Sequence, residues 1–211
     1  MNNMQNQSAF FFLDGENNVS DFKLHKNDKR KIFLFCTSVS NTEKVININM
    51  EESFSESEAI ILVVGTGNQD IKIKTTQKHQ RSETKSRLLV KSVLFGQSSF
   101  DFEGLICIEK QAEKSEASLE NYNLLMSSKA SVNIKPYLEI KNKDVICSHG
   151  SATSTINSEE FYYLKSRGIT DKNAERLIVK GFLRDIIDRV SDDKKFKMIE
   201  KRINDKLNRA L

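Results

Sequence analysis

The chain has 211 residues, enough for one sizeable domain or for two small ones that share a core. Charged residues make up 29% and hydrophobic residues 38%, a balance typical of a globular protein and not of a disordered chain. Three cysteines without a CxxC spacing argue against a disulfide framework and a structural zinc site, and they favour a reducing cytoplasm.

Neither end of the chain indicates a membrane or a nucleic acid as partner. Near the N-terminus the longest apolar run, Phe10–Leu13, has four residues, so we expect no signal peptide and no membrane span. The net charge is only +4. Most of it lies between Ser191 and Leu211, a segment that contains seven lysines and arginines but only four acidic residues. Because no aromatic residues alternate with these cations, we expect a solvated helix and no nucleic acid.

From Lys31 to Cys147 the hydrophobic pattern has a period of two, which predicts short β-strands. The candidates are Ile32–Phe35, Val45–Ile48, Ile60–Val64, Ile71–Lys74, Leu88–Leu94, Phe100–Phe102, Leu105–Ile108 and Tyr137–Ile140. Such a series allows a sandwich, a barrel or a β-helix. Two-residue hairpin loops are scarce, with Asp14-Gly15 the one Asp-Gly dipeptide, so the stacked rungs of a β-helix are favoured, although no clean repeat is visible.

After Ile156 the period changes to about 3.6, which predicts helices. Asn157 is the expected cap of the first helix and Gly168 its end. Thr170 is expected to cap the second helix, whose apolar face is predicted to comprise Ala174, Leu177, Ile178, Gly181, Phe182, Asp185, Ile186 and Ile187. A last helix carries Phe196, Ile199, Ile203 and Leu207 at helical spacing. The sequence thus predicts a β body over residues 1–155 and a small helical domain over residues 156–211.

Cys147 and His149 form the most informative pair of side chains. Residues two apart in an extended strand lie on the same face, so the thiol and the imidazole point the same way. This pair suits iron, copper(I) or an iron–sulfur unit. Two ligands cannot hold a cluster alone, and a cysteine in such a position can equally fill the core.

The surroundings of this pair contain several ordered blocks. The first is His-x4-Thr-x-Ser-x4-Lys-x-Val-Leu, formed by His79, Thr84, Ser86, Lys91, Val93 and Leu94. The next are Phe102–Gly104, Asn123–Ser127, Lys135–Ile140, Cys147–Gly150 and Phe161–Ile169. In these blocks the region from Lys78 to Ile187 resembles the SufB/SufD family, and the SufD branch in particular, whereas the first 77 residues match less clearly.

The resemblance implies a right-handed parallel β-helix with a helical C-terminal domain. It also implies a non-enzymatic scaffold for iron–sulfur cluster assembly, with no tightly bound cofactor and a cluster that is bound transiently. A SufB-like chain would be the partner at the β-helix. His149, with Cys147 as the weaker candidate, would contact the nascent cluster at the interface of the two chains.

The resemblance further implies that a SufC-type ATPase docks on the C-terminal helices. The residues expected either in this docking surface or in the core of the helical domain are Phe161, Leu164, Arg167, Ile178, Phe182 and Ile186.

Departures from the family pattern favour a SufD-like subunit. The position of the SufB-type cysteine is occupied by Ala130, so a SufD-like subunit is expected. The resemblance further leads us to expect a short member that lacks the longer N-terminal half of full-length members.

Two alternatives of other classes remain open. One is a β-helix interaction module without cluster chemistry. The other is a polysaccharide-active enzyme, for which Glu51, Glu52, Glu56 and Glu58 would be the candidate carboxylates. With no tryptophan and four tyrosines the chain offers no aromatic platform for sugars, which disfavours the enzyme. His79 is expected to be structural.

Overall fold

The computed structural model describes residues 6–14, 18–37, 43–189 and 193–210. Within these ranges eleven strands precede three helices. The strands are β1 (Asn6–Phe12), β2 (Val19–Leu24), β3 (Lys29–Cys36), β4 (Glu43–Met50), β5 (Glu56–Gly65), β6 (Asp70–His79), β7 (Lys85–Leu94), β8 (Ser99–Ile108), β9 (Ser115–Leu125), β10 (Ser131–Ile140) and β11 (Val145–Thr155). The helices are α1 (Ser158–Ser166), α2 (Asp171–Ile187) and α3 (Asp193–Ala210).

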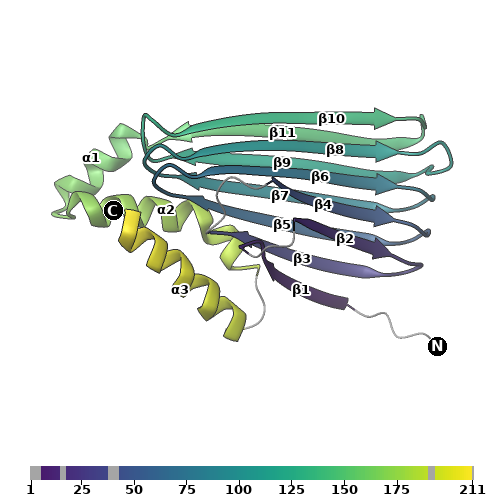
Figure 1. Ribbon diagram of the computed structural model, residues 1–211, viewed down its shortest axis with the longest axis horizontal. Coiled ribbons are helices and arrows are strands. Elements are labelled where there is room, and N and C mark those ends of the chain that lie inside the picture. Colours follow the sequence, from purple (N-terminus) through teal and green to yellow (C-terminus); the bar gives the residue numbers. More distant parts are fainter. Residues whose placement is uncertain (1–5, 15–17, 38–42, 190–192, 211) are drawn as a thin grey trace.

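The strands form a parallel β-helix of two facing sheets (Figure 1). Odd-numbered strands make one sheet in the order β1-β3-β5-β7-β9-β11, and even-numbered strands make the other in the order β10-β8-β6-β4-β2. Five rungs, from β1 and β2 to β9 and β10, contain one strand of each sheet, and β11 adds a sixth strand to the first sheet alone. Every neighbouring pair is parallel. The prediction of stacked rungs is confirmed, and the sandwich and barrel alternatives are wrong.

The register between rungs explains why no repeat was visible in the sequence. Asn6 pairs with Lys29, an offset of 23 residues, whereas Lys85 pairs with Glu116, an offset of 31. Turns of unequal length therefore separate equivalent positions. Four strands, β1, β2, β9 and β11, were missing from the predicted list, and β8 was predicted as two shorter pieces.

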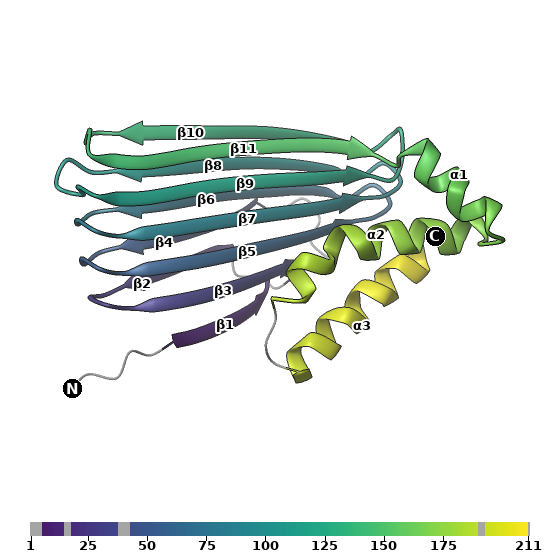
Figure 2. The same cartoon turned by 180° about the vertical axis from the view of Figure 1, so that it is seen from behind.

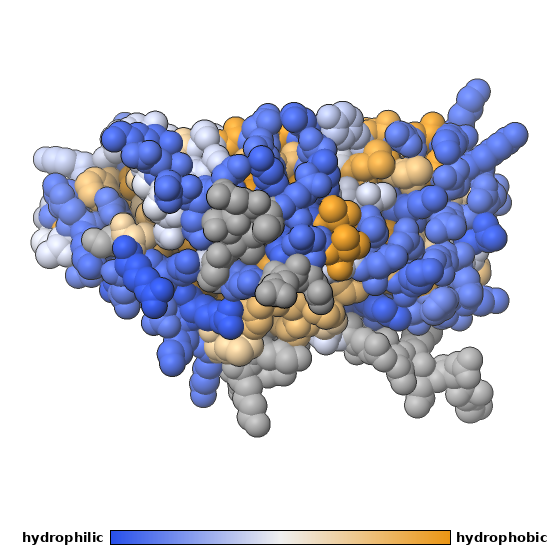
Figure 3. Space-filling view, in the orientation of Figure 1, coloured by the Kyte–Doolittle hydropathy of each residue, from blue (hydrophilic) through white to orange (hydrophobic). Residues whose placement is uncertain are grey.

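A hydrophobic core fills the space between the two sheets. Inward side chains from both sheets form one buried cluster that includes Leu34, Ile48, Ile73, Val90 and Phe102. Alternate residues on the five-stranded sheet point outward and are mainly charged, which agrees with the largely hydrophilic face in Figure 3. Salt bridges such as that between Lys74 and Glu43, at 2.9 Å, join neighbouring rungs on this face.

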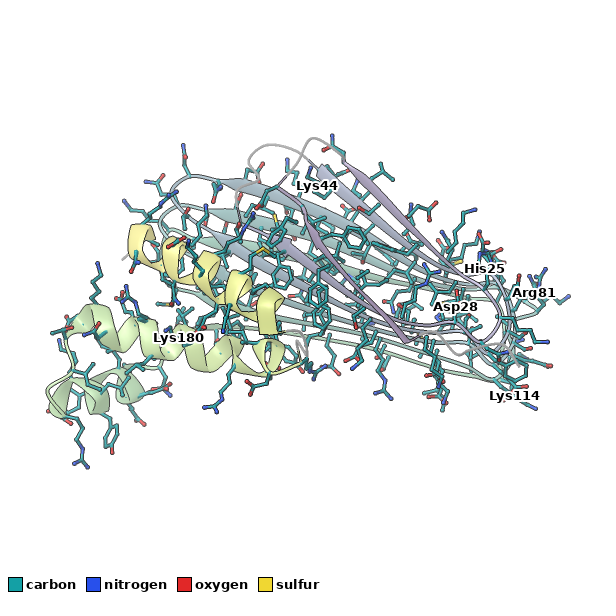
Figure 4. The ribbon with its side chains drawn as sticks, turned by 90° about the horizontal axis from the view of Figure 1, so that it is seen from below. His25, Asp28, Lys44, Arg81, Lys114 and Lys180 are labelled. Carbon is teal, nitrogen blue, oxygen red and sulfur yellow. The ribbon has the colours of Figure 1, made fainter. Side chains whose placement is uncertain are left out.

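The corners of the β-helix repeat a left-handed backbone position. Asn27, Phe54, Glu83 and Lys114 have φ values between 55° and 63°, one in each of the first four turns that lead from an even strand to the next odd strand; the turn from β10 to β11 has none. Because they share this turn position in successive rungs, these corners stack at one end of the molecule, where His25, Asp28, Arg81 and Lys114 gather in Figure 4. At the opposite end Gly67 and Gly96 have φ +65°, and a Cβ on Gly96 would lie 2.8 Å from the carbonyl oxygen of Gly67.

Helices α2 and α3 cover the carboxyl-terminal half of the six-stranded sheet (Figure 2). A second buried cluster joins outward residues of this sheet, such as Phe35, Leu62 and Val93, to Leu183 and Ile203 on the helices. Lys91 reinforces this contact because its Nζ donates hydrogen bonds to the Phe182 carbonyl oxygen at 2.7 Å and to Asp185 at 2.6 Å. Helices α2 and α3 therefore share a core with the β-helix.

The helix predictions are confirmed in part. Asn157 caps α1, since its side chain accepts hydrogen bonds from the amides of Glu159 and Glu160, and Gly168 ends it at φ +83°. Thr170 lies at the cap position of α2 but makes no side-chain capping bond. The predicted face of α2 is correct in part. Ala174 and Ile186 are buried, and Ile178, Phe182 and Ile187 pack against the core. Leu177, Gly181 and Asp185 are exposed instead, and Val179 and Leu183, which were not predicted, are buried. A period of 3.6 residues is compatible with more than one adjacent apolar stripe on a helix, and packing against the sheet determines which of them is buried.

The last helix follows its predicted stripe. Ile199, Ile203 and Leu207 are buried, and the side chain of Phe196 lies outside the described residues. No helix in the described part of the chain is both long enough and apolar enough to cross a lipid bilayer.

Candidate functional site

The β-helix has an open end formed by β10 and β11. Each of these strands is the outermost strand of its sheet and pairs with one neighbour, β8 or β9. The other edge of each strand presents unpaired backbone N–H and C=O groups, which another chain can extend. The eleven residues of β11 include no Asp, Glu, Lys or Arg, so this edge lacks the charges with which proteins commonly block edge pairing.

His149 lies on the inward face of β11 at this open end. In the register of the six-stranded sheet its position follows Ile32, Ala59, Leu88 and Leu119, all of which are buried in the core between the sheets. His149 itself is exposed because no further rung covers it. The structure therefore places an imidazole where each earlier rung has an aliphatic side chain.

Cys147 lies on the same face, one step along the strand. Its position follows Ser57, Ser86 and Ala117, and its side chain is half-buried against the core cluster. Burial raises the pKa of the Cys147 thiol, which keeps it protonated at neutral pH in the isolated chain. The expectation that Cys147 and His149 share a face is met, and the face is the inward one.

The opposite side of the open end is apolar. Leu138 and Ile140 on β10 continue the inward positions of buried Ile106 and Ile108. Both nevertheless remain exposed, at 40% and 43%. Exposed apolar groups of this kind stabilise an association when another surface covers them. The open end thus combines an unfinished apolar core with one imidazole and one thiol.

Within the described residues, no three His, Cys, Asp or Glu side chains gather closely enough to hold a metal ion. Cys147 and His149 could supply two soft-metal ligands from one strand, and a structural iron or iron–sulfur centre needs more than two. Any further ligands would have to approach from the solvent side of the open end.

The other motif histidine, His79, is structural. Its side chain is fully buried between the sheets, with Nδ1 2.7 Å from the Thr84 hydroxyl and Nε2 2.8 Å from the Ser86 hydroxyl. Gln77 donates to the same Ser86 hydroxyl at 2.7 Å. Burial lowers the pKa of His79 to about 4, so the ring is neutral at pH 7. The His-x4-Thr-x-Ser spacing therefore corresponds to a buried hydrogen-bond network of His79, Thr84 and Ser86 at one corner of the β-helix.

The acidic residues proposed for a polysaccharide enzyme are paired with cations of the preceding rung. Glu51 contacts Lys23 at 3.2 Å, Glu56 contacts Lys29 at 3.0 Å, and Glu58 is 3.3 Å from Lys31. Glu52 contacts His25 at 3.5 Å. Glu51 and Glu52 lie in the turn after β4, whereas Glu56 and Glu58 lie on β5 and line one shallow hollow. Because both of these carboxylates are held in ion pairs with lysines of β3, the geometry does not favour a pair of catalytic acids.

The residues expected for ATPase docking divide between core and surface. Ile186 is fully buried, while Ile178 and Phe182 are half-buried against the cluster beneath the helices. Phe161 and Leu164 are half-buried, and Arg167 is exposed with its guanidinium 5.2 Å from the Tyr163 ring.

The docking residues predicted from the sequence do not include the most exposed apolar residues of α1 and α2, which together are called the helical arm below. Tyr162 is 74% exposed, Tyr163 56% and Leu177 49%. No residue of α1 is buried, and the helix extends beyond the end of the sheets in Figure 2. Both tyrosines belong to the same sequence block as Phe161 and Leu164. The sequence alone could not show which residues of this block lie on the surface, and their exposure in the structure does.

Comparison with known proteins agrees with this geometry. Residues 17–182 match the family described as SUF system FeS cluster assembly, SufBD core domain. The chain therefore belongs to the SufB/SufD family.

Some of the relatives that the chain matches are named SufD, and others are named only as SufBD family proteins. The chain is 30% identical to the iron–sulfur cluster assembly protein SufD of Escherichia coli over 175 residues, which cover 83% of this chain and 41% of the relative. It is 30% identical to SufD of Bacillus subtilis over 146 residues, or 69% of this chain and 33% of that protein. A SufBD family protein of Synechocystis is 29% identical over 145 residues, 69% of this chain and 32% of the relative. The matches thus span less than half of each relative.

Proposed function

We propose that this chain is a SufD-like scaffold subunit for iron–sulfur cluster assembly. It acts without catalysing a reaction itself, holds no tightly bound cofactor, and contacts the nascent cluster as cargo. Its partner at the open end of the β-helix is a SufB-like chain, and a SufC-type ATPase docks on its helical arm. The observation that carries the proposal is the position of His149, exposed at the end of an otherwise aliphatic column.

The open end supports the pairing with a second β-helix. A free parallel edge on each sheet, β11 without charges, and the exposed Leu138 and Ile140 together favour a partner that adds strands and covers the core. A SufB-like chain docked there would close the space above His149 and exclude water from it. Ligands from both chains would then face one partly dry cavity, where thiolate and neutral imidazole bind iron best.

The helical arm supports the docking of the ATPase. Tyr162, Tyr163 and Leu177 expose aromatic and aliphatic surface on α1 and α2, and tyrosine is frequent among the residues that anchor protein interfaces. Because α2 shares a core with the six-stranded sheet, a movement of the ATPase would reach the β-helix through α2.

Co-expression with SufB-like and SufC-like chains tests the proposal. We expect the three chains to co-purify and the complex to show visible absorption from an iron–sulfur cluster after reconstitution. His149→Ala should leave co-purification intact and reduce this absorption strongly. If the wild-type chains do not co-purify, the scaffold proposal is wrong. Unchanged absorption in the His149→Ala complex would instead favour an interaction module without cluster chemistry.

A further inference from the structure

The outer face of the six-stranded sheet has an uncovered half, away from α2 and α3. Three adjoining hollows lie along it, with volumes of about 330, 200 and 160 Å³. Arg87, an exposed residue of β7, lines all three. Arg87 is thus the residue that these three hollows share.

The carboxylates around Arg87 have other partners, which are cations for Glu58 and Glu116 and the Tyr122 hydroxyl, at 3.1 Å, for Glu120. Glu58 contacts Lys31 at 3.3 Å and Arg189 at 3.1 Å, and Glu116 contacts Lys85 at 2.8 Å. The Arg87 guanidinium, by contrast, makes no ion pair or hydrogen bond with any described residue. A fixed positive charge with five N–H donors is therefore left over between three hollows.

Small polar residues lead from Arg87 to the open edge. In the register of the sheet, Arg87 pairs with Ser118, and Ser118 pairs with Ser148 on β11. The smallest of the three hollows is lined by all three of these residues together with Lys85, Ile146 and Glu116, whose carboxylate is paired with Lys85. Ile146 is 69% exposed beside it. The hollow is consequently continuous with the edge on which the partner chain docks.

We infer that this hollow receives a carboxylate side chain of the chain that docks on β11, which pairs with Arg87. The inference rests on the proposed function, because it names the chemistry of the same interface. The guanidinium fork matches a carboxylate in a bidentate pair, and Ser118 and Ser148 can donate further hydrogen bonds. The nearby Glu58, Glu116 and Glu120 would repel a doubly charged phosphate more strongly, so a singly charged carboxylate fits better.

The affinity of the purified chain for its SufB-like partner tests the inference as a function of salt. Arg87→Glu should weaken binding about tenfold or more at low ionic strength, chiefly through slower association, with a difference that shrinks as salt is added. Arg87→Lys should fall between wild type and Arg87→Glu, since it keeps the charge and loses the fork. Lys110→Glu, at an exposed corner that does not line any of the three hollows, makes the same change of charge and should bind like wild type.

Two outcomes separate this inference from the function on which it rests. If Arg87→Glu binds as tightly as wild type and with the same salt dependence, or if Lys110→Glu is weakened equally, the assignment to Arg87 is overturned while the pairing of the chains stands. If the wild-type chain does not bind the partner, both are overturned. Thermal unfolding of each variant verifies that the exposed substitutions leave the fold intact.

Discussion

His149 on β11 pairs in the parallel ladder with Leu119 on β9, so an exposed imidazole lies directly above a buried leucine. The two residues occupy equivalent positions in successive strands of the sheet. Leu119 is buried because β11 covers it, whereas His149 is exposed because no described strand covers β11. The polar residue is thus found at the β11 end of this column, where a partner chain can reach it.

The first prediction concerns this pair. His149→Leu extends the aliphatic column to the open end, and we expect it to change the free energy of unfolding by no more than about 0.5 kcal/mol, because the position is exposed. In the co-purified complex the same variant should lose most of the cluster absorption. Ser151→Ala, which removes a polar group two residues further along the same face, is the matched control and should keep it. A full-strength spectrum in His149→Leu would contradict the role of the imidazole.

The second prediction concerns Gly104, which lies inside the core. A Cβ there would be 2.4 Å from Leu119 Cδ1 and 2.8 Å from the Phe102 ring. We therefore expect Gly104→Ala to destabilise the chain by about 1–3 kcal/mol in urea unfolding, as overpacking does elsewhere. Gly150→Ala is the control, since no atom lies within 4 Å of its Cβ, and should be close to neutral.

A double-mutant cycle refines this second prediction. Leu119→Val in the Gly104→Ala background should recover part of the lost stability, because the shorter side chain relieves the contact with the new methyl group. Additive effects of the two substitutions would show that the clash is absorbed elsewhere.

The third prediction is the pH dependence caused by His79. Its pKa is about 4 in the folded chain and 6.5 in the unfolded chain, so the unfolded state binds more protons between these values. Stability from this group is present above pH 6.5 and is lost as the pH falls toward 4. The loss should reach about 2 kcal/mol at pH 5 relative to pH 7.

Urea unfolding at several pH values checks this contribution. His79→Gln keeps a hydrogen-bonding side chain but cannot titrate, so the part of the slope between pH 5 and 7 that His79 causes should disappear. At pH 7 this variant should be less stable than wild type, because the Thr84 and Ser86 hydroxyls lose well-placed partners. An unchanged slope would show that other groups produce it.

The fourth prediction concerns Lys91, which holds α2 on the sheet. Lys91→Met keeps an unbranched apolar stem but removes both hydrogen bonds and the contact of Nζ with the Phe182 ring, 4.6 Å from its centroid. We expect a loss of about 1–2 kcal/mol, and faster proteolytic cleavage within α1 and α2 than in the strands. Asp185→Asn is the milder control because it retains a hydrogen-bond acceptor. Equal cleavage rates in Lys91→Met and wild type would contradict this role.

The sequence by itself determined the kind of fold and the chemistry of the candidate site. Period-two runs without tight hairpin loops indicated stacked strands, the change of period after Ile156 marked the helices, and Cys147 and His149 stood two residues apart as potential soft-metal ligands. These are local properties: they depend on alternation along a strand and on residue type, which one chain segment carries within itself.

Only the tertiary structure decided which face and which rung each residue occupies. Alternation could not show that Cys147, and with it His149, points inward, because Val145 and Ile146 just before Cys147 are both apolar. Nor could it show that the last rung is uncovered or that Ile186 is core while Tyr162 is exposed. The physical reason is that burial depends on neighbours about 30 residues away in sequence, such as Ser115 opposite Val145, and turns of unequal length hide that spacing.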